Sequence, residues 1–206
     1  KLLHPDAEYL LQKFIMNHPE SPQVRTVYMH LGRHYFDRKQ YKKSIEYFEL
    51  VELFDLSDSD VAEYYFKTGY AYFSLNDYDK AATKFFEIKD KESEYQIPAL
   101  YYYSHIAYQN GKYEAALSGF LILKNNANFK SVAPFYISQI YFRQNRYEEV
   151  VKFAVPLVDS VKAEKAVEMN KLIGDSYYNL AKYQEAIPYL KKYNSTGSPN
   201  RQDHYT

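Results

Sequence analysis

The sequence predicts an all-α protein, an α-α superhelix built of stacked antiparallel helical hairpins. A short phrase centred on a tyrosine occurs five times, and successive copies are 37, 35, 34 and 36 residues apart. Around each tyrosine, apolar residues recur at the i, i+3, i+4, i+7 spacing of one helix face. A period near 35 residues with helical patterning is typical of a solenoid. The repeated tyrosines are Tyr41, Tyr78, Tyr113, Tyr147 and Tyr183.

Small residues flank every repeated tyrosine at constant distances. The first set, nine positions before the tyrosine, is Gly32, Gly69, Ser104, Ser138 and Gly174. The second set, three positions after it, is Ser44, Ala81, Ala116, Val150 and Ala186. Antiparallel helices approach to about 8 Å only where no bulky side chain stands between them. We therefore expect each copy to be one hairpin whose two helices meet at these small residues.

The elements follow in order along the chain. Residues 1–22 are expected to hold the second helix of a truncated repeat, because Ala7, Leu11 and Phe14 match the second half of a copy. Residues 198–206 are expected to start a further repeat, so residues 1–206 are interpreted as a single solenoid fragment of a larger protein. The full hairpins are expected in residues 23–58, 59–94, 95–129, 130–163 and 164–197.

Proline positions refine the expected helices. Pro98 and Pro134 fall in the first turn of first helices, where no intrahelical donor is lost. Pro156 falls eight residues into a second helix, so we expect a kink or an early break near Val155 and Pro156. In the acidic stretch from residue 46 to residue 63, helix N-capping at residues 57–60 is favoured over docking of a basic partner.

The pattern within one copy carries a family resemblance. It reads aromatic, Leu-Gly, Tyr, then Tyr, a small residue and an aromatic residue, and it resembles the tetratricopeptide repeat. Other copies depart from it, for example with Thr68 in place of the leucine. The resemblance covers essentially the whole chain and implies a TPR solenoid that binds a peptide, a helix or a protein surface in a groove lined by the first helices. In the first full copy the residues are Tyr28, Leu31, Gly32, Tyr35, Tyr41, Ser44 and Phe48.

The same resemblance implies which residues face that groove. Repeat positions 5, 9 and 12 commonly do so in this family, and here they are rich in tyrosine and phenylalanine, which suit recognition of a partner. Packing of the solenoid is the other explanation for these aromatic residues. The candidate partner-binding residues are Met29, Arg33, Phe36, Phe66, Tyr70, Phe73, Tyr101, His105, Tyr108, Phe135, Gln139, Phe142, Lys171, Asp175 and Tyr178.

Two alternatives to a binding scaffold stay open. The stacking surfaces would also suit a structural spacer or a self-associating module, and the aromatic groove would suit contact with a glycan. Residues 14–22 and 31–36 are similar to repeat proteins of the Gram-negative cell envelope, including relatives of outer-membrane assembly lipoproteins and of Tol-Pal-associated periplasmic proteins. That resemblance implies the periplasm or the cell envelope of a bacterium.

Composition bears on several other function classes. The 26 basic residues balance the 26 acidic ones, so no overall positive field attracts nucleic acid. No run approaches the roughly 18 apolar residues of a membrane span. The six glycines build no phosphate-binding loop, and the chain has no cysteine. We therefore expect no enzyme, no catalytic residue, no cofactor and no metal site, and a protein or peptide as the partner.

Overall fold

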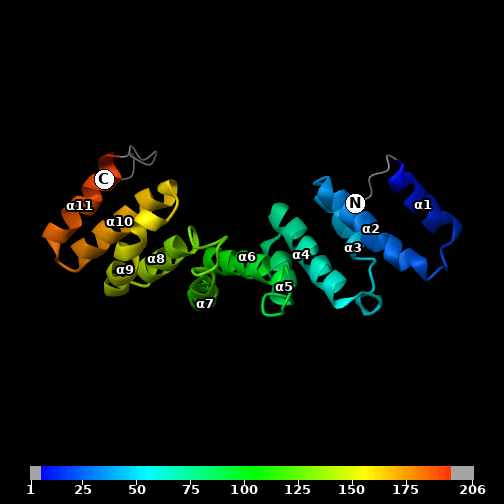
Figure 1. The fold of residues 1–206 in the computed structure, drawn as a ribbon, viewed down its shortest axis with the longest axis horizontal. Coiled ribbons are helices and arrows are strands. Elements are labelled where there is room, and N and C mark those ends of the chain that lie inside the picture. The colour runs from blue at the N-terminus through cyan, green and yellow to red at the C-terminus, as the bar shows by residue number, and fades with distance from the viewer. Residues whose placement is uncertain (1–5, 196–206) are drawn as a thin grey trace. The chain divides into compact units, whose positions relative to one another are not determined.

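The computed structural model describes residues 6–195, which form helices and, within that range, no β-strand (Figure 1). The prediction of an all-α helical repeat is confirmed. The α-helices are α1 (Ala7–Asn17), α2 (Gln23–Asp37), α3 (Tyr41–Phe48), α4 (Asp58–Ser74), α5 (Tyr78–Phe86), α6 (Gln96–Gln109), α7 (Tyr113–Leu123), α8 (Ala133–Arg143), α9 (Tyr147–Ala154), α10 (Ala163–Asn179) and α11 (Tyr183–Ser195). Two 3₁₀ helices are η1 (Leu53–Asp55) and η2 (Val155–Ser160).

The chain divides into two compact units. The N-terminal unit is Lys1–Ile106 and the C-terminal unit is Ala107–Thr206. In the N-terminal unit α2 packs on α3 and α4 packs on α5, while in the C-terminal unit α8 packs on α9 and α10 packs on α11. The expected start of a further repeat at residues 198–206 lies outside the described residues, and the repeat boundaries stay a prediction.

The two helices of a hairpin meet at the small residues. The Ser44 hydroxyl donates a hydrogen bond of 2.8 Å to the carbonyl oxygen of Gly32, which joins α3 to α2 across the hairpin. A Cβ atom at Gly32 would lie 2.5 Å from ring carbons of Phe48, and one at Gly174 would lie 2.6 Å from Leu190. Such distances leave no room for a side chain, which explains why glycine occupies these places.

One backbone turn joins first and second helices throughout. Two residues before each repeated tyrosine, the chain takes a positive φ between 56° and 70°. The next amide then donates to a carbonyl five residues back, as from Gln40 to Tyr35 at 2.9 Å, which is the bond of a Schellman cap. The residues with positive φ are Lys39, Asn76, Gly111, Asn145 and Ala181.

The prolines act on the helices in different ways. α9 ends at Ala154 and the chain continues as the 3₁₀ helix η2, so the predicted break near Pro156 is confirmed. Proline has no amide proton and its ring clashes with the carbonyl four residues back. Pro98 and Pro134 lie in the first turns of α6 and α8, as expected. Pro188 lies inside α11.

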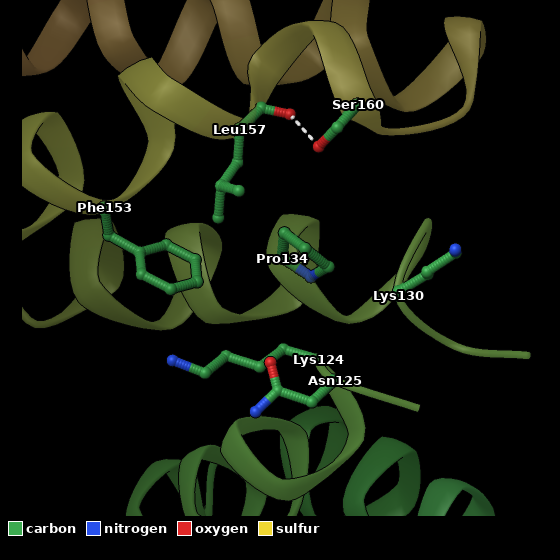
Figure 2. Close-up of a pocket in the computed structure, with 7 residues that line it drawn as sticks. All are labelled: Lys124, Asn125, Lys130, Pro134, Phe153, Leu157 and Ser160. Atoms are coloured by element: carbon green, nitrogen blue, oxygen red, sulfur yellow. Dashed lines mark hydrogen bonds between the residues drawn. The ribbon is translucent and has the colours of Figure 1, made fainter. Parts of the chain in front are cut away.

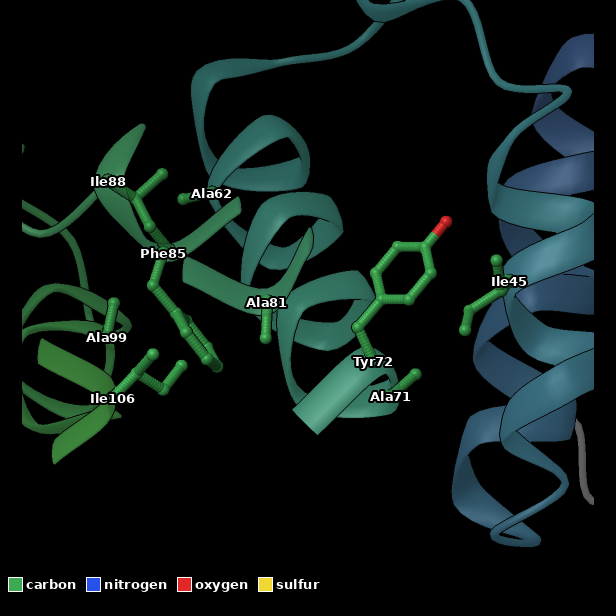
Figure 3. Packing of buried hydrophobic residues seen from close by; sticks show 9 residues of the cluster. All are labelled: Ile45, Ala62, Ala71, Tyr72, Ala81, Phe85, Ile88, Ala99 and Ile106. Carbon is green, nitrogen blue, oxygen red and sulfur yellow. The ribbon is translucent and has the colours of Figure 1, made fainter. Parts of the chain in front are cut away.

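Aromatic and aliphatic side chains fill the space between hairpins. In the N-terminal unit Phe85 and Ile88 of the α5 segment pack against Ala99 and Ile106 of α6, and all four are buried (Figure 3). The Tyr102 ring stacks on Phe85 with 5.2 Å between ring centroids. In the C-terminal unit a second cluster joins α8, α9, η2 and α10. An isolated hairpin cannot bury both faces, so stacking of hairpins creates the core.

Candidate functional site

A continuous set of partly exposed rings, here called the aromatic strip, runs over α2, the start of α3, α4 and α6 in the N-terminal unit. Its rings contact one another in a chain, with centroid separations of 5.7 Å for Phe36 and Tyr70, 5.4 Å for Tyr70 and Tyr102, and 5.0 Å for Tyr102 and Phe73. The strip therefore connects α2, α4 and α6. Its members are Phe36, Tyr41, Phe66, Tyr70, Phe73, Tyr101, Tyr102 and His105.

The strip contains six of the predicted partner-binding residues. Phe73 contacts His105 at 6.0 Å, and His105 stacks on Tyr101 at 6.1 Å, which brings in the predicted residues of α6. Tyr41 and Tyr102 belong to the strip, although positions 5, 9 and 12 of the repeat do not include them. The signal for Tyr41 was present in the sequence, because it is the repeated tyrosine of its copy.

Several strip residues also hold the hairpins together. Phe66 lies 5.9 Å from the buried ring of Phe85 and 5.1 Å from Tyr95. Burial, followed by the charge of Glu63, raises the pKa of Tyr95 to about 12. Burial also raises the pKa of Tyr102. Both phenols are therefore neutral at physiological pH and keep a proton to donate.

Two predicted partner-binding residues lie in the core. Met29 is 1% exposed and packs with Phe48 and Tyr64, and Phe135 is 2% exposed and packs in the core of the C-terminal unit. Their places in the repeat matched the groove pattern, but neighbouring hairpins cover them. For these two residues the packing explanation holds, and we do not assign them to a surface.

Arg33, another predicted contact, is engaged within the chain. Its guanidinium donates to Glu63 at 3.0 and 2.6 Å and also bonds Asp60, so it joins α2 to α4. Lys67 pairs with Glu63 at 2.9 Å, and its ammonium lies 5.1 Å from the centroid of the Phe36 ring. We call these residues, Arg33, Asp60, Glu63 and Lys67, the ion cluster; it borders the aromatic strip.

The ion cluster shifts the pKa of both carboxyl groups downward. Burial alone would raise the pKa of Glu63, but hydrogen bonds from Arg33 and Lys67 outweigh it and hold the value below 4.5. The pKa of Asp60 is lowered by the hydroxyl of Ser57 and then by Arg33. Ser57 is also the N-cap of α4, where it accepts a bond from the Asp60 amide, in line with the expected capping role of residues 57–60.

In the C-terminal unit, the predicted residues Tyr108 and Gln139 contact each other. The Tyr108 hydroxyl donates to the Gln139 side chain and accepts a 3.1 Å bond from Arg143. Tyr136 packs against Tyr108 with 5.5 Å between centroids. The predicted Phe142 contacts Tyr147 at 5.5 Å. Polar groups are thus more prominent here than in the aromatic strip.

The remaining predicted residues lie on α10. Tyr178 is 62% exposed and packs on Tyr183 of the next helix at 5.3 Å. The ammonium of Lys171 lies 5.6 Å from the centroid of the Tyr193 ring. The carbonyl of Asp175 accepts a bond from Asn179. These three residues are not part of the aromatic strip.

The described residues show no arrangement typical of a metal or membrane site. No three metal-ligating side chains gather among residues 6–195. Within the same range no helix combines the length and the apolar character needed to cross a bilayer.

Comparison with known proteins identifies the repeats. Two family models described as tetratricopeptide repeat match the chain, one at residues 26–55 and 167–195 and the other at residues 63–91. No curated protein sequence matches it.

Solved structures with the same fold cover nearly the whole chain. The crystal structure of MamA protein is 15% identical and superposes with a TM-score of 0.65, over 90% of this chain and 98% of that one. A structure of YrrB, described as a TPR protein with an unusual peptide-binding site, is 13% identical with a TM-score of 0.70, over 92% of this chain and 93% of that one. At such identities these similarities establish the fold. Together with the repeated hairpins and the family-model matches, they support a tetratricopeptide-repeat protein.

Proposed function

We propose that this protein is a protein-interaction scaffold, and that the aromatic strip of the N-terminal unit receives an apolar helix or extended peptide of a partner protein. The observation that carries the proposal is the unbroken series of partly exposed rings from Phe36 to His105. A surface of this kind offers large contact area and loses little conformational entropy on binding.

The state of the neighbouring charges supports an apolar partner segment. The charges of Arg33 and Glu63 are paired within the chain, so they are not available as strong attractors of a charged ligand. Contacts among Phe66, Phe85 and Tyr95 hold the strip in place before binding, which lowers the entropic penalty of association. The peptide-binding site named for YrrB, a structure of the same fold, is consistent with this function.

Site-specific photo-crosslinking in the native host tests the location. A photoreactive phenylalanine analogue at Tyr70 should capture a protein partner, because Tyr70 lies in the middle of the strip. The matched control is the same analogue at Phe54, which is 75% exposed in η1 and outside the strip. Capture at both positions, or at Phe54 alone, would place the partner elsewhere.

Affinity for the captured partner tests the energetics. Phe73→Ala removes one ring from the strip and should weaken binding by about 2 kcal/mol, roughly thirtyfold. Phe54→Ala is the control and should leave the affinity unchanged, with circular dichroism confirming that both variants fold. If Phe73→Ala binds like the unmodified protein, the strip is not the interface.

A further inference from the structure

A pocket lies in the C-terminal unit, close to the helix break at Pro156. It has a volume of about 440 Å³ and sits between the end of α7, the start of α8, and the junction of α9 with η2 (Figure 2). None of the candidate partner-binding residues lines it. The lining residues are Lys124, Asn125, Lys130, Pro134, Phe153, Leu157 and Ser160.

The lining combines an apolar surface with positive charge. Pro134, Phe153 and Leu157 supply the apolar part, while Lys124 and Lys130 supply two ammonium groups. No carboxylate lines the pocket, and among the residues that the structure describes none forms an ion pair with either lysine. The Lys124 ammonium lies 5.6 Å from the centroid of the Phe153 ring. A ligand here would meet charge and apolar surface side by side.

Backbone bonds shape the pocket without a ligand. The Lys130 amide donates to Asn126 at 2.8 Å, which closes the turn that carries this lysine. The Ser160 hydroxyl donates to the carbonyl of Leu157 at 2.7 Å (Figure 2), and the Lys162 amide bonds Ser131 at 3.3 Å. The break at Pro156 ends α9 and starts the η2 turn that carries Leu157.

The N-terminus of α8 is not the source of anion recognition. The amides of Val132 and Ala133 donate to the Phe129 carbonyl at 2.9 and 2.8 Å, and Pro134 has no amide proton. These backbone donors are therefore already used or missing. The groups in the pocket that can bind a negative charge are therefore the ammonium groups of Lys124 and Lys130.

We propose that this pocket binds an acidic peptide segment of a partner protein, in which a large apolar side chain stands beside aspartate or glutamate. The apolar side chain would pack against Phe153, Pro134 and Leu157, and the carboxylates would pair with Lys124 and Lys130. Charge complementarity favours this ligand, because the pocket has two cations and no lining anion. Its size and mixed lining match those of ordinary ligand sites. The pocket is a second contact surface, independent of the aromatic strip.

Nuclear magnetic resonance with a defined peptide tests the proposal. The probe is a capped peptide of sequence Gly-Ser-Glu-Phe-Asp-Ser-Gly, titrated to millimolar concentration into the ¹⁵N-labelled full chain. We expect amide shifts concentrated at residues 124–134 and 153–160. Two matched peptides, one with Gln and Asn for the acids and one with Ala for Phe, should each bind about tenfold more weakly.

Variants of the protein then test whether the charges of Lys124 and Lys130 bind the acidic side chains of the probe peptide. Lys124→Glu combined with Lys130→Glu should weaken the probe about tenfold or more, whereas Lys182→Glu, an exposed lysine in the turn before α11, should have no effect. Phe73→Ala should also leave it unchanged, which separates this site from the aromatic strip. The proposal is overturned if the probe shifts other residues or none, if the double variant binds it normally, or if inorganic phosphate gives the same shifts with the same affinity.

Discussion

At the scale of single residues, the glycines of the first helices differ in how much room they leave for a side chain. A Cβ atom at Gly32 would lie 2.5 Å from the ring of Phe48, which is fully buried. A Cβ atom at Gly69 would have Phe85 Cε1 as its nearest neighbour, at 3.0 Å. The same residue type thus occupies two sites of different tightness.

Alanine substitution should separate these two sites. Gly32→Ala should lower the free energy of unfolding by about 1–3 kcal/mol, because Phe48 must be displaced. Gly69→Ala should change it by less than about 1 kcal/mol, since the higher helix propensity of alanine offsets a small adjustment. Urea titration followed by circular dichroism measures both values. Equal losses would mean that the hairpins adjust more freely than their contacts indicate.

The ion cluster makes stability depend on pH in a predictable direction. The pKa of Glu63 is below its ordinary value of 4.5 in the folded state, so the stabilisation is complete above that pH and is lost as the pH falls through the lower, folded-state value. Glu63→Gln should therefore lose about 1–2 kcal/mol at pH 7 and progressively less below pH 4.5. Glu46→Gln, at an exposed carboxyl of α3, is the control and should show neither effect. A loss for Glu63→Gln that stays constant down to pH 2.5 would contradict the assignment.

At the scale of elements, the turn between paired helices recurs with five different sequences. Only one of its left-handed residues is glycine, at Gly111, whereas Ala181 takes a φ of 57° with a Cβ atom. An L-residue in this region is strained by about 1 kcal/mol or more. The same backbone hydrogen bond closes the turn in all five copies despite that strain. The turn conformation was therefore not readable from residue type, although the position of the turn was.

Glycine at this position should stabilise the last described hairpin. Ala181→Gly relieves the strain in the folded state and should raise the free energy of unfolding by roughly 0.5–1 kcal/mol, after the larger entropy loss of glycine is included. Gly111→Ala is the reciprocal change and should lower the free energy of unfolding by a similar amount, because residue 111 has a φ of 70°. The added Cβ atom would meet open space, so the loss would come from the backbone conformation and not from a clash. Thermal unfolding of both variants measures the signs. A destabilised Ala181→Gly would show that the strain is negligible.

At the scale of the whole molecule, the periodicity of the sequence predicted the features that are set within a single repeat. It did not predict the features that are set by contact between neighbouring repeats. The helices, the small-residue contacts and the break at Pro156 follow from spacing within a repeat. The burial of Met29 and the ion pair of Arg33 with Glu63 depend on the neighbouring hairpin, so a position within one repeat could not reveal them. The resemblance to cell-envelope proteins stays a prediction.

A repeat architecture should also respond locally to damage. Each hairpin contacts mainly its neighbours, so destabilisation in one unit should not spread evenly. Hydrogen exchange should speed up in α2 and α3 for Gly32→Ala, and in α10 and α11 for Gly174→Ala, whose Cβ would lie 2.6 Å from Leu190. A uniform increase in both variants would show that the chain unfolds as one cooperative block.

The Schellman turns have a consequence for how such a protein acquires new specificities. Backbone hydrogen bonds fix the length of the turn inside each hairpin. Insertions and deletions are therefore better tolerated in the segments that join one hairpin to the next, here called joints, where the chain is irregular. The pocket that holds Lys124 and Leu157 lies at such a joint. Joints can therefore diversify by insertion, deletion or a single proline while the hairpins persist, and they offer protein engineers a place to graft recognition without redesigning the scaffold.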